Sequence, residues 1–225
     1  MPIIDPAPTH QTRVWRATTS DVLAAAGVLT EAFANYPWTR FTVAADNHLE
    51  RIQALHRLLL ERVALPYGTV HLATVGYDRA EPDAVAVWLP PEPAVPEAEW
   101  THLAGLTAEL LGDRATAAAD ADAASAGLRP ATPHWLLAAV GVRPGKQGRG
   151  LGRAVLAPTL HRADTQHAHA YLETSTAANV GFYTGLGFTV SGEVDLADGR
   201  LHVWAMLRQP QGTHGRPEYL PSAAV

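Results

Sequence analysis

Three glycines at alternate positions form the segment of this chain with the clearest chemical signal. Gly148, Gly150 and Gly152 follow a nearly continuous apolar run at 135–142, the length expected of a strand buried on both faces. They open a segment, from Gly148 to about Ala163, with apolar residues at helical spacing. A helix N-terminus offers free N–H groups and a positive dipole end, and glycine lets an anion approach the backbone. The nearby cationic side chains are Lys146, Arg149 and Arg153. The segment therefore predicts a pyrophosphate cradle.

Spacing separates three phosphate-binding loops that compete for this segment. A P-loop needs Ser or Thr after Gly-Lys, but a glutamine follows Gly145-Lys146. The dinucleotide fingerprint needs glycine at the sixth position from Gly148, which is Arg153. The third pattern is Gln or Arg, two residues, Gly, one residue, then Gly or Ala, and it is met by Gln147, Gly150 and Gly152. It resembles the acetyl-CoA loop of the GNAT superfamily of N-acetyltransferases. A plain strand-to-helix turn is the alternative for this match alone.

A second segment further along the chain fits the same superfamily. Residues 179–188, Asn-Val-Gly-Phe-Tyr-Thr-Gly-Leu-Gly-Phe, resemble the GNAT segment that carries a tyrosine on a helix and enters the next strand at Leu-Gly-Phe. Two matches in the right order favour the resemblance over a chance turn. It implies a mixed α/β (α+β) fold with a mostly antiparallel central sheet of six or seven strands flanked by helices. It also implies that two central strands, here ending at Val142 and Thr174, splay apart around the cofactor.

The resemblance implies acetyl-CoA as cosubstrate and assigns its contacts. Main-chain groups of Val140 and Val142 would hold the pantetheine arm, and Asn179 would hydrogen-bond it, although alone it could be only a helix cap. Tyr183 matches the family tyrosine near the thioester sulfur, which would act as general acid to the thiolate; a core aromatic is the alternative. The expected cofactor-binding residues are Val140, Gly141, Val142, Gln147, Gly148, Arg149, Gly150, Leu151, Gly152, Arg153, Asn179 and Phe182.

A carboxylate in an otherwise apolar strand is the second catalytic candidate. Glu173 lies in the strand 168–174, where a charge is costly to bury without a partner or a purpose. It could take a proton from the acceptor ammonium, directly or through water, or simply bind that cation. The alternatives are an exposed charge at the strand end and an ion pair with Arg40 or Arg149.

Aromatic residues indicate the acceptor side. Tyr36, Trp38 and Trp88, together with Glu173, are the expected substrate-binding residues, and flat walls suit a ring-bearing or nucleoside-like amine, although core aromatics would look the same. Further segments resemble the branch of the superfamily that acetylates aminonucleoside antibiotics such as puromycin. Two other functions stay open, a non-catalytic GNAT domain that senses CoA and a peptide or protein N-acetyltransferase with an open groove.

Periodicity places these candidates on elements. Strands are expected at 14–17, 70–75, 84–89, 135–142, 168–174, 188–194 and 201–207. Helices are expected from a cap at Thr19 or Ser20, at 48–63, and at 178–186. Pro158 is expected to kink or end the helix at 148–163. An alanine-rich helical insertion at about 96–126, broken near Gly112, stands before the cofactor strand and is predicted to cover the site. The last two strands would turn at Asp198-Gly199.

Composition bounds the remaining possibilities. The chain has 225 residues, 47% of them hydrophobic, enough for one domain at 13–208 between a loose arm at 1–12 and a tail at 209–225. It has no cysteine, and its histidines lack metal-ligand spacing, so no metal is expected. The formal net charge of −5, without a dense basic cluster, argues against nucleic-acid partners. No apolar run of membrane-spanning length or secretory signal is found, so we expect a cytoplasmic protein, monomer or homodimer, with a small-molecule amine as partner.

Overall fold

The computed structural model describes residues 12–76, 81–92, 95–196 and 199–212. Over these residues the chain forms a seven-stranded sheet with the order β1-β2-β3-β4-β5-β7-β6. The strands are β1 (Thr12–Arg16), β2 (Thr69–Val75), β3 (Ala84–Leu89), β4 (His134–Val142), β5 (His169–Thr174), β6 (Thr189–Leu196) and β7 (Leu201–Arg208). All neighbouring strands are antiparallel except β4 and β5, which are parallel. The mixed, mostly antiparallel sheet expected from the sequence is therefore confirmed.

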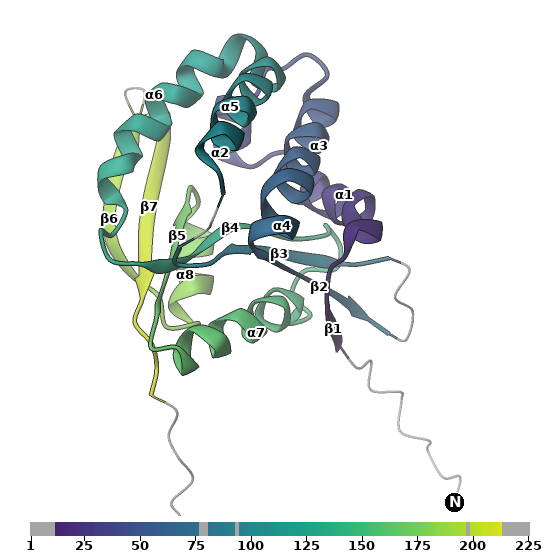
Figure 1. Ribbon diagram of the computed structural model, residues 1–225, viewed down its shortest axis with the longest axis vertical. Helices are drawn as coiled ribbons and strands as arrows, with labels where there is room; N and C mark the ends of the chain where they lie inside the picture. The colour runs from purple at the N-terminus through teal and green to yellow at the C-terminus, as the bar shows by residue number, and fades with distance from the viewer. Residues whose placement is uncertain (1–11, 77–80, 93–94, 197–198, 213–225) are drawn as a thin grey trace, which may run out of the picture.

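Helices cover both faces of this sheet (Figure 1). They are α1 (Val22–Phe33), α2 (Pro37–Thr42), α3 (His48–Leu59), α4 (Leu65–Tyr67), α5 (Glu97–Leu111), α6 (Ala115–Ser125), α7 (Leu151–Thr165) and α8 (Ala177–Thr184). In the view of Figure 1, α7 and α8 lie below the sheet and α1, α3 and α5 lie above it. None of the helices in the described segments is long and apolar enough to cross a membrane.

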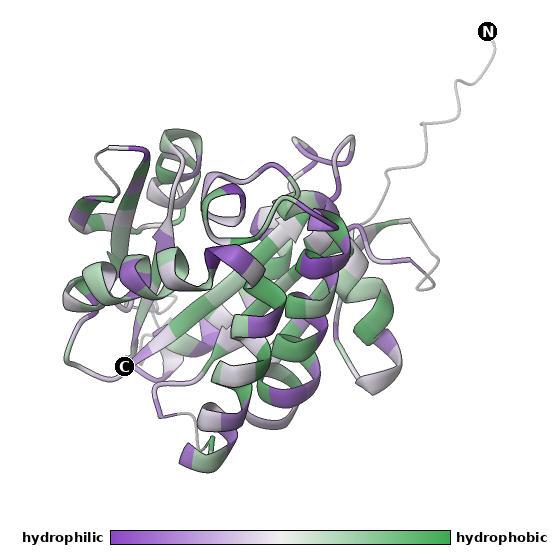
Figure 2. Cartoon of the chain, turned by 90° about the horizontal axis from the view of Figure 1, so that it is seen from above, coloured by the Kyte–Doolittle hydropathy of each residue, from purple (hydrophilic) through white to green (hydrophobic). Residues whose placement is uncertain are grey.

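Two apolar layers hold the sheet between these helices. On one face, Val155, Leu156 and Leu160 of α7 pack against Trp88, Trp135 and other strand residues. On the other face, α1 packs against β2 and β3 through Leu29 and its neighbours. Every residue of β3 is buried, because this strand has helices on both sides. Figure 2 shows the resulting apolar stretches along the strands and the adjoining helices.

The parallel pair at the centre of the sheet separates after a short contact. Pairing between β4 and β5 covers only three positions, from His134 opposite His169 to Leu136 opposite Tyr171. A bulge on β4 follows, since Val87 and Trp88 of β3 face Ala139 and Leu137 and leave Ala138 without a partner. A bulge bends the strand that carries it. The remaining part of β4 stays paired with β3 and diverges from β5, as the splayed strands of the sequence prediction require.

Three local predictions need correction. The first helical turn, at Thr19–Asp21, is capped by Thr18, whose backbone N–H donates to Asp21 Oδ2 at 2.8 Å, and not by Thr19 or Ser20. The segment at 48–63 is not one α-helix, because a π-helical turn at Leu60–Ala64 follows α3. Pro158 does not end α7, which continues to Thr165. Pro158 lies on the exposed side of α7, so a carbonyl that loses its partner can meet water while the buried residues hold the helix to the sheet.

Other elements agree with the prediction, or lie partly outside the described residues. The alanine-rich insertion is helical and broken by a 3-10 turn at Gly112–Arg114, as expected. The short helix α2 was not expected and begins with Pro37, which suits the first position of a helix. The arm at 1–12, the turn at Asp198-Gly199 and the tail at 209–225 lie wholly or largely outside the described residues.

Candidate active site

The divergence of β4 and β5 opens into a cavity of about 770 Å³, within the range of small-molecule sites. Its floor is formed by Leu137–Val142 of β4 and Leu172–Ser175 at the end of β5. One end is closed by the glycine loop, the start of α7 and the side chains of α8. The other end is closed by the α1–α2 turn and by two residues of the insertion region, Asp122 and Arg129.

The glycine loop lines the first end of the cavity through Gln147, Gly148, Gly150 and Gly152. Gly145, Gly148 and Gly150 have φ angles of +80°, +73° and +79°, which favour glycine, and a Cβ at each would meet no protein atom within 4 Å. The space beside them is therefore open toward a ligand. Helix α7 begins at Leu151 with Gly150 as its N-cap, slightly later than the sequence indicated. Its free N–H groups lie at the cavity, because Gly150, Leu151 and Gly152 all line it.

Two glycines of the predicted cofactor set have a packing role. A Cβ on Gly141 would lie 2.8 Å from Ala32 Cβ, so this glycine lets α1 approach β4. A Cβ on Gly152 would lie 3.2 Å from Phe182 Cζ, so that glycine brings α8 against the start of α7. Both residues still line the cavity through their backbones.

The cations of the loop are placed unequally. Arg153 lines the cavity and donates to the carbonyl oxygen of Gly185 at 3.0 Å, which fixes it beside α8. Lys146 pairs with Asp83 at 3.3 Å and does not line the cavity. Arg149 is exposed and does not line the cavity. Arg153 is thus the loop cation that contributes to the cavity as it stands.

A hydroxyl pair connects the two ends of the cavity. Tyr36 Oη lies 2.9 Å from Thr174 Oγ1 and accepts a hydrogen bond from the backbone N–H of Ser175 at 2.6 Å. Asn179 Nδ2 donates to the same Thr174 oxygen at 3.0 Å. The two hydroxyls carry two hydrogens, and only one is used between them. The other has no acceptor among the described residues, and both hydroxyl-bearing side chains line the cavity. A ligand in the cavity can accept it.

Tyr183 of α8 lines the cavity at the end that the glycine loop forms. Its ring is 95% buried and meets Phe182 and Phe188 edge-on, with centroids 5.2 and 5.8 Å away. Burial raises the pKa of Tyr183 well above its ordinary value, and the nearby Tyr36 adds to the shift. The phenol therefore keeps its proton at neutral pH while lining the cavity.

Glu173 faces the other end of the cavity and is held by two neighbours. Tyr171 donates its hydroxyl to Glu173 Oε1 at 2.9 Å, and Arg129 Nε lies 3.3 Å from the same oxygen. An ion pair, which the sequence left as an alternative for Glu173, therefore exists, but with Arg129 and not with Arg40 or Arg149. Arg129 follows the 3-10 turn after α6, and nothing in the local sequence pattern indicated that it would reach β5.

The aromatic wall differs in part from the sequence expectation. Tyr36 and Trp38 line the cavity, and so does Phe33, which was not among the predicted site residues. Trp88 does not line it, because its side chain is fully buried in the core beneath β3. A buried strand residue points to the face that the sheet pleat dictates, and the core-facing position of Trp88 argues against a substrate contact. No group of His, Asp and Glu suited to a metal ion is found in the described segments.

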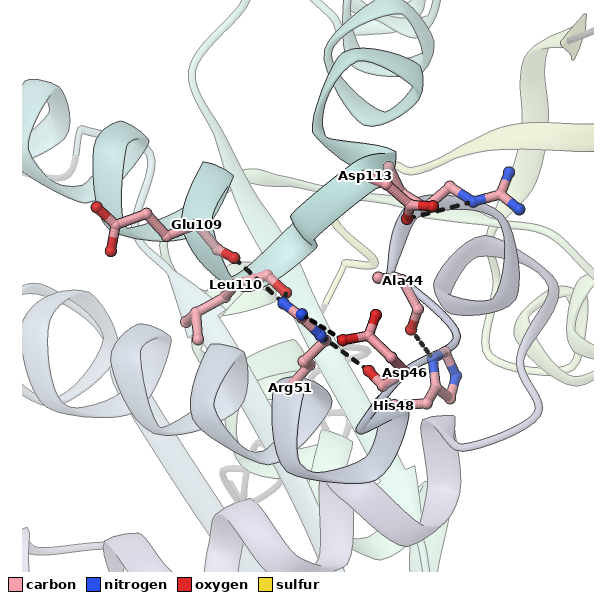
Figure 3. Close-up of polar contacts among 8 residues, drawn as sticks. Ala44, Asp46, His48, Arg51, Glu109, Leu110 and Asp113 are labelled. Carbon is pink, nitrogen blue, oxygen red and sulfur yellow. Dashed lines mark hydrogen bonds and ion pairs between the residues drawn. The ribbon is translucent and has the colours of Figure 1, made fainter.

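The end of α5 in the insertion is fastened to α3 (Figure 3). Arg51 of α3 donates through Nη1 to the carbonyl oxygens of Glu109 and Leu110, at 3.2 and 3.0 Å, and pairs with Asp46 at 2.8 Å. A cation at a helix C-terminus is favourable. Gly112 follows with φ +64°, and a Cβ there would lie 3.1 Å from Arg51 Nη1. The chain turns at this point and places α6 over the cavity.

These features define a class of protein before any relative is considered. A mixed sheet with two parallel strands diverging beside a glycine loop, followed by a tyrosine helix, is the GNAT fold, the architecture of acetyl-CoA-dependent N-acetyltransferases. Residues 98–206 match the family model of the acetyltransferase (GNAT) domain. The chain therefore contains a GNAT acetyltransferase domain and is an enzyme of the N-acetyltransferase class.

Solved structures of acetyltransferases share this fold. The chain is similar to a Corynebacterium glutamicum protein described as histone acetyltransferase HPA2 and related acetyltransferase, with 25% identity and a TM-score of 0.69 over 94% of this chain and 99% of that chain. It is also similar in fold to the Drosophila melanogaster polyamine N-acetyltransferase, with 14% identity and a TM-score of 0.55 over 88% and 100% of the two chains. A third similar structure, yncA from Salmonella typhimurium with its cofactor acetyl-CoA, has 19% identity and a TM-score of 0.50 over 93% and 99%.

Proposed function

We propose that this chain transfers the acetyl group of acetyl-CoA to the amine of a small molecule, by direct transfer in a ternary complex. The observation that carries the proposal is the single cavity in which the diverging β4 and β5 strands, the glycine loop and Tyr183 meet Glu173. A cofactor end and an acceptor end in one cavity allow both substrates to be present together, as direct transfer requires.

The cofactor end fits acetyl-CoA. The loop glycines have open space and positive φ angles, and the α7 N-terminus presents N–H groups beside Arg153, as a pyrophosphate requires. The backbone of Val140–Val142 and the Asn179 amide would hold the pantetheine arm in the strand opening. When bound, acetyl-CoA supplies the activated acetyl group. A related fold has been solved with acetyl-CoA as its cofactor.

Two side chains of the chain would move protons. Tyr183 is protonated at neutral pH, as tyrosines are, and its raised pKa keeps it so at higher pH; it would donate its phenolic proton to the leaving sulfur. Glu173 would receive the proton of the acceptor ammonium, directly or through water, or hold that cation. The spare hydrogen of the Tyr36–Thr174 pair would stabilise negative charge on an oxygen bound in the strand opening.

The acceptor proposed first is an aminonucleoside such as puromycin. Several segments resemble puromycin N-acetyltransferase: Tyr36-Pro37, Thr39-Arg40, 84–88, 139–142, 147–152 and 172–175. The resemblance extends from about Arg16 to Arg208 and departs in the insertion, at Trp38 and in the longer ends. The insertion and Trp38 both contribute to the cavity. Structural neighbours include agmatine and polyamine N-acetyltransferases, so the fold accepts varied small amines.

Thiol release from acetyl-CoA, measured with puromycin, other aminonucleosides, polyamines and a few peptides, tests this function. We expect turnover with a small amine, and a fall in kcat of roughly 100-fold in Tyr183→Phe with acetyl-CoA binding retained. The control is Tyr67→Phe, which removes a hydroxyl at the end of α4, outside the cavity. CoA binding without turnover on any amine would instead indicate a sensor domain, and turnover confined to peptides would refute a small-molecule acceptor.

A further inference from the structure

The acceptor end of the cavity carries more negative than positive charge. Asp122, Arg129 and Glu173 all line it, while the remaining lining cation, Arg153, is held beside α8 at the cofactor end. Two carboxylates therefore face one guanidinium. The wall between them and the strand opening is aromatic and includes Trp38.

The three charged residues are not equivalent. Arg129 is committed to Glu173, whose bonded oxygen also receives the Tyr171 hydroxyl. The Asp122 carboxylate makes no hydrogen bond or ion pair within the described part of the chain, and its side chain stays exposed at the cavity. Its negative charge is the one left without a direct partner.

The packing of α6 fixes where this charge lies. Ala121, the residue before Asp122, is buried in a cluster with Leu196, Leu201 and Val203 of the β6–β7 hairpin, and Trp38 of α2 packs against the same cluster. This packing fixes α6 against α2 and the hairpin, and both Asp122 and Trp38 line the cavity. Although the residue is exposed, the cavity walls partly desolvate its carboxyl group and so raise the pKa of Asp122; the charge of Arg129 opposes this shift, and the charge of Glu173 adds to it. An incoming cation would relieve the repulsion between the two carboxylates.

We propose that Asp122 is a specificity-determining residue that selects acceptors carrying a positive charge next to a flat apolar body. The inference rests on the proposed function and adds a division of labour. Arg129 holds Glu173 in place near the strand opening, and Asp122 supplies a carboxylate without a hydrogen bond or ion pair that docks the cation in the part of the cavity with the aromatic wall. The matching substrate class is a protonated amine with an aromatic or heterocyclic ring.

The test compares two acceptors of similar shape in steady-state kinetics, a primary alkylamine that is protonated at the assay pH and an arylamine that is neutral. In Asp122→Asn we expect the KM of the alkylamine to rise about tenfold, with kcat and the KM of acetyl-CoA nearly unchanged. The KM of the neutral arylamine should change little. Added salt should raise the alkylamine KM more in the parent protein than in the variant.

The matched control is Asp120→Asn, two residues earlier on α6, where the same charge is removed from an exposed position that does not line the cavity. Its kinetics should match those of the parent. Equal KM changes for the charged and the neutral acceptor, or equal effects of the two variants, would overturn the role of Asp122. A failure of the proposed function can be told apart, because the parent protein would then acetylate none of the amines. A parent protein that turns over both acceptors, with no selective effect of Asp122→Asn, would refute only the role of Asp122.

Discussion

The two ends of the cavity are built in different ways. The cofactor end consists largely of backbone: loop glycines, the start of α7 and the part of β4 that diverges from β5, all within residues 137–153. The acceptor end consists of side chains from α1, α2, α6 and β5, which are far apart in sequence. A ligand common to a whole class of enzymes can be held by backbone, whereas a particular acceptor is recognised by side chains that can vary. Tyr36 connects the two ends through Thr174 and Ser175.

The largest effect we expect is a loss of folding stability at acidic pH, caused by a buried histidine behind the aromatic wall of the acceptor end. His56 is almost fully buried behind Phe33, with ring centroids 5.2 Å apart, and burial lowers its pKa from 6.5 to about 4. Between these pH values the unfolded chain binds a proton that the folded chain does not. The contribution of the neutral, buried His56 to the free energy of unfolding is therefore fully present above pH 6.5 and is lost as the pH decreases toward 4. The expected loss is about 3 kcal/mol.

Urea denaturation at several pH values measures this loss. In His56→Leu the slope of unfolding free energy against pH should be smaller in that window, while His102→Gln, at an exposed site on α5, should leave it unchanged. The same slope in the parent and in His56→Leu would show that His56 does not make the acceptor end acid-sensitive.

Adding a single methyl group to the backbone of the cofactor end should weaken CoA binding. Gly150→Ala places a side chain at φ +79° and fills open space at the cradle, so we expect the dissociation constant of CoA to rise roughly 100-fold by calorimetry. Gly105→Ala, on α5 with open space around it, is the control and should bind CoA normally. Normal CoA binding by Gly150→Ala would mean that this backbone does not form the pyrophosphate cradle.

Removing the Tyr36 hydroxyl, which connects the two ends of the cavity, should impair the reaction with respect to both substrates. Tyr36→Phe removes the oxygen that accepts from Ser175 N–H and one of the two hydroxyl hydrogens beside the strand opening. We expect kcat/KM to fall about tenfold for both acetyl-CoA and the acceptor. A change restricted to the acceptor KM would show that Tyr36 is only part of the aromatic wall and does not connect the ends.

The smallest expected effect is a weaker binding of the acceptor alone, caused by loosening the end of α5. Arg51→Met removes the cation that holds the α5 terminus, so we expect the acceptor KM to rise by roughly fivefold, a change of about 1 kcal/mol, with CoA binding intact. Arg57→Met, also on α3, removes an exposed pair with Glu61 of the following π-helical turn; it is the matched control and should leave the acceptor KM unchanged. If Arg51→Met weakened CoA binding as strongly, the two ends would not be separable.

The sequence determined the parts of this protein that depend on local pattern. The glycine loop, the strand before it, the tyrosine helix and the alanine-rich insertion broken at Gly112 each follow from neighbouring residues, because helix and strand periodicity and glycine conformation act over short distances. The antiparallel pair β2–β3 followed from short β-branched runs in the same way. Pro158 shows the limit, since the helix penalty of one proline was outweighed by the packing of α7 on the sheet.

Only the tertiary structure decided how distant residues meet. Arg129 pairs with Glu173 across 44 residues of sequence, and Tyr36 reaches Ser175 across 139. Trp88 points into the core and Trp38 lines the cavity because different faces of their elements are covered by the rest of the protein. The residues of each element do not show which face will be covered. Asp122 is one of several acidic residues among alanines, and it becomes part of the acceptor end because Ala121 and the β6–β7 hairpin orient α6. Contacts of this kind depend on the packing of whole elements, which the spacing of residues along the chain does not encode.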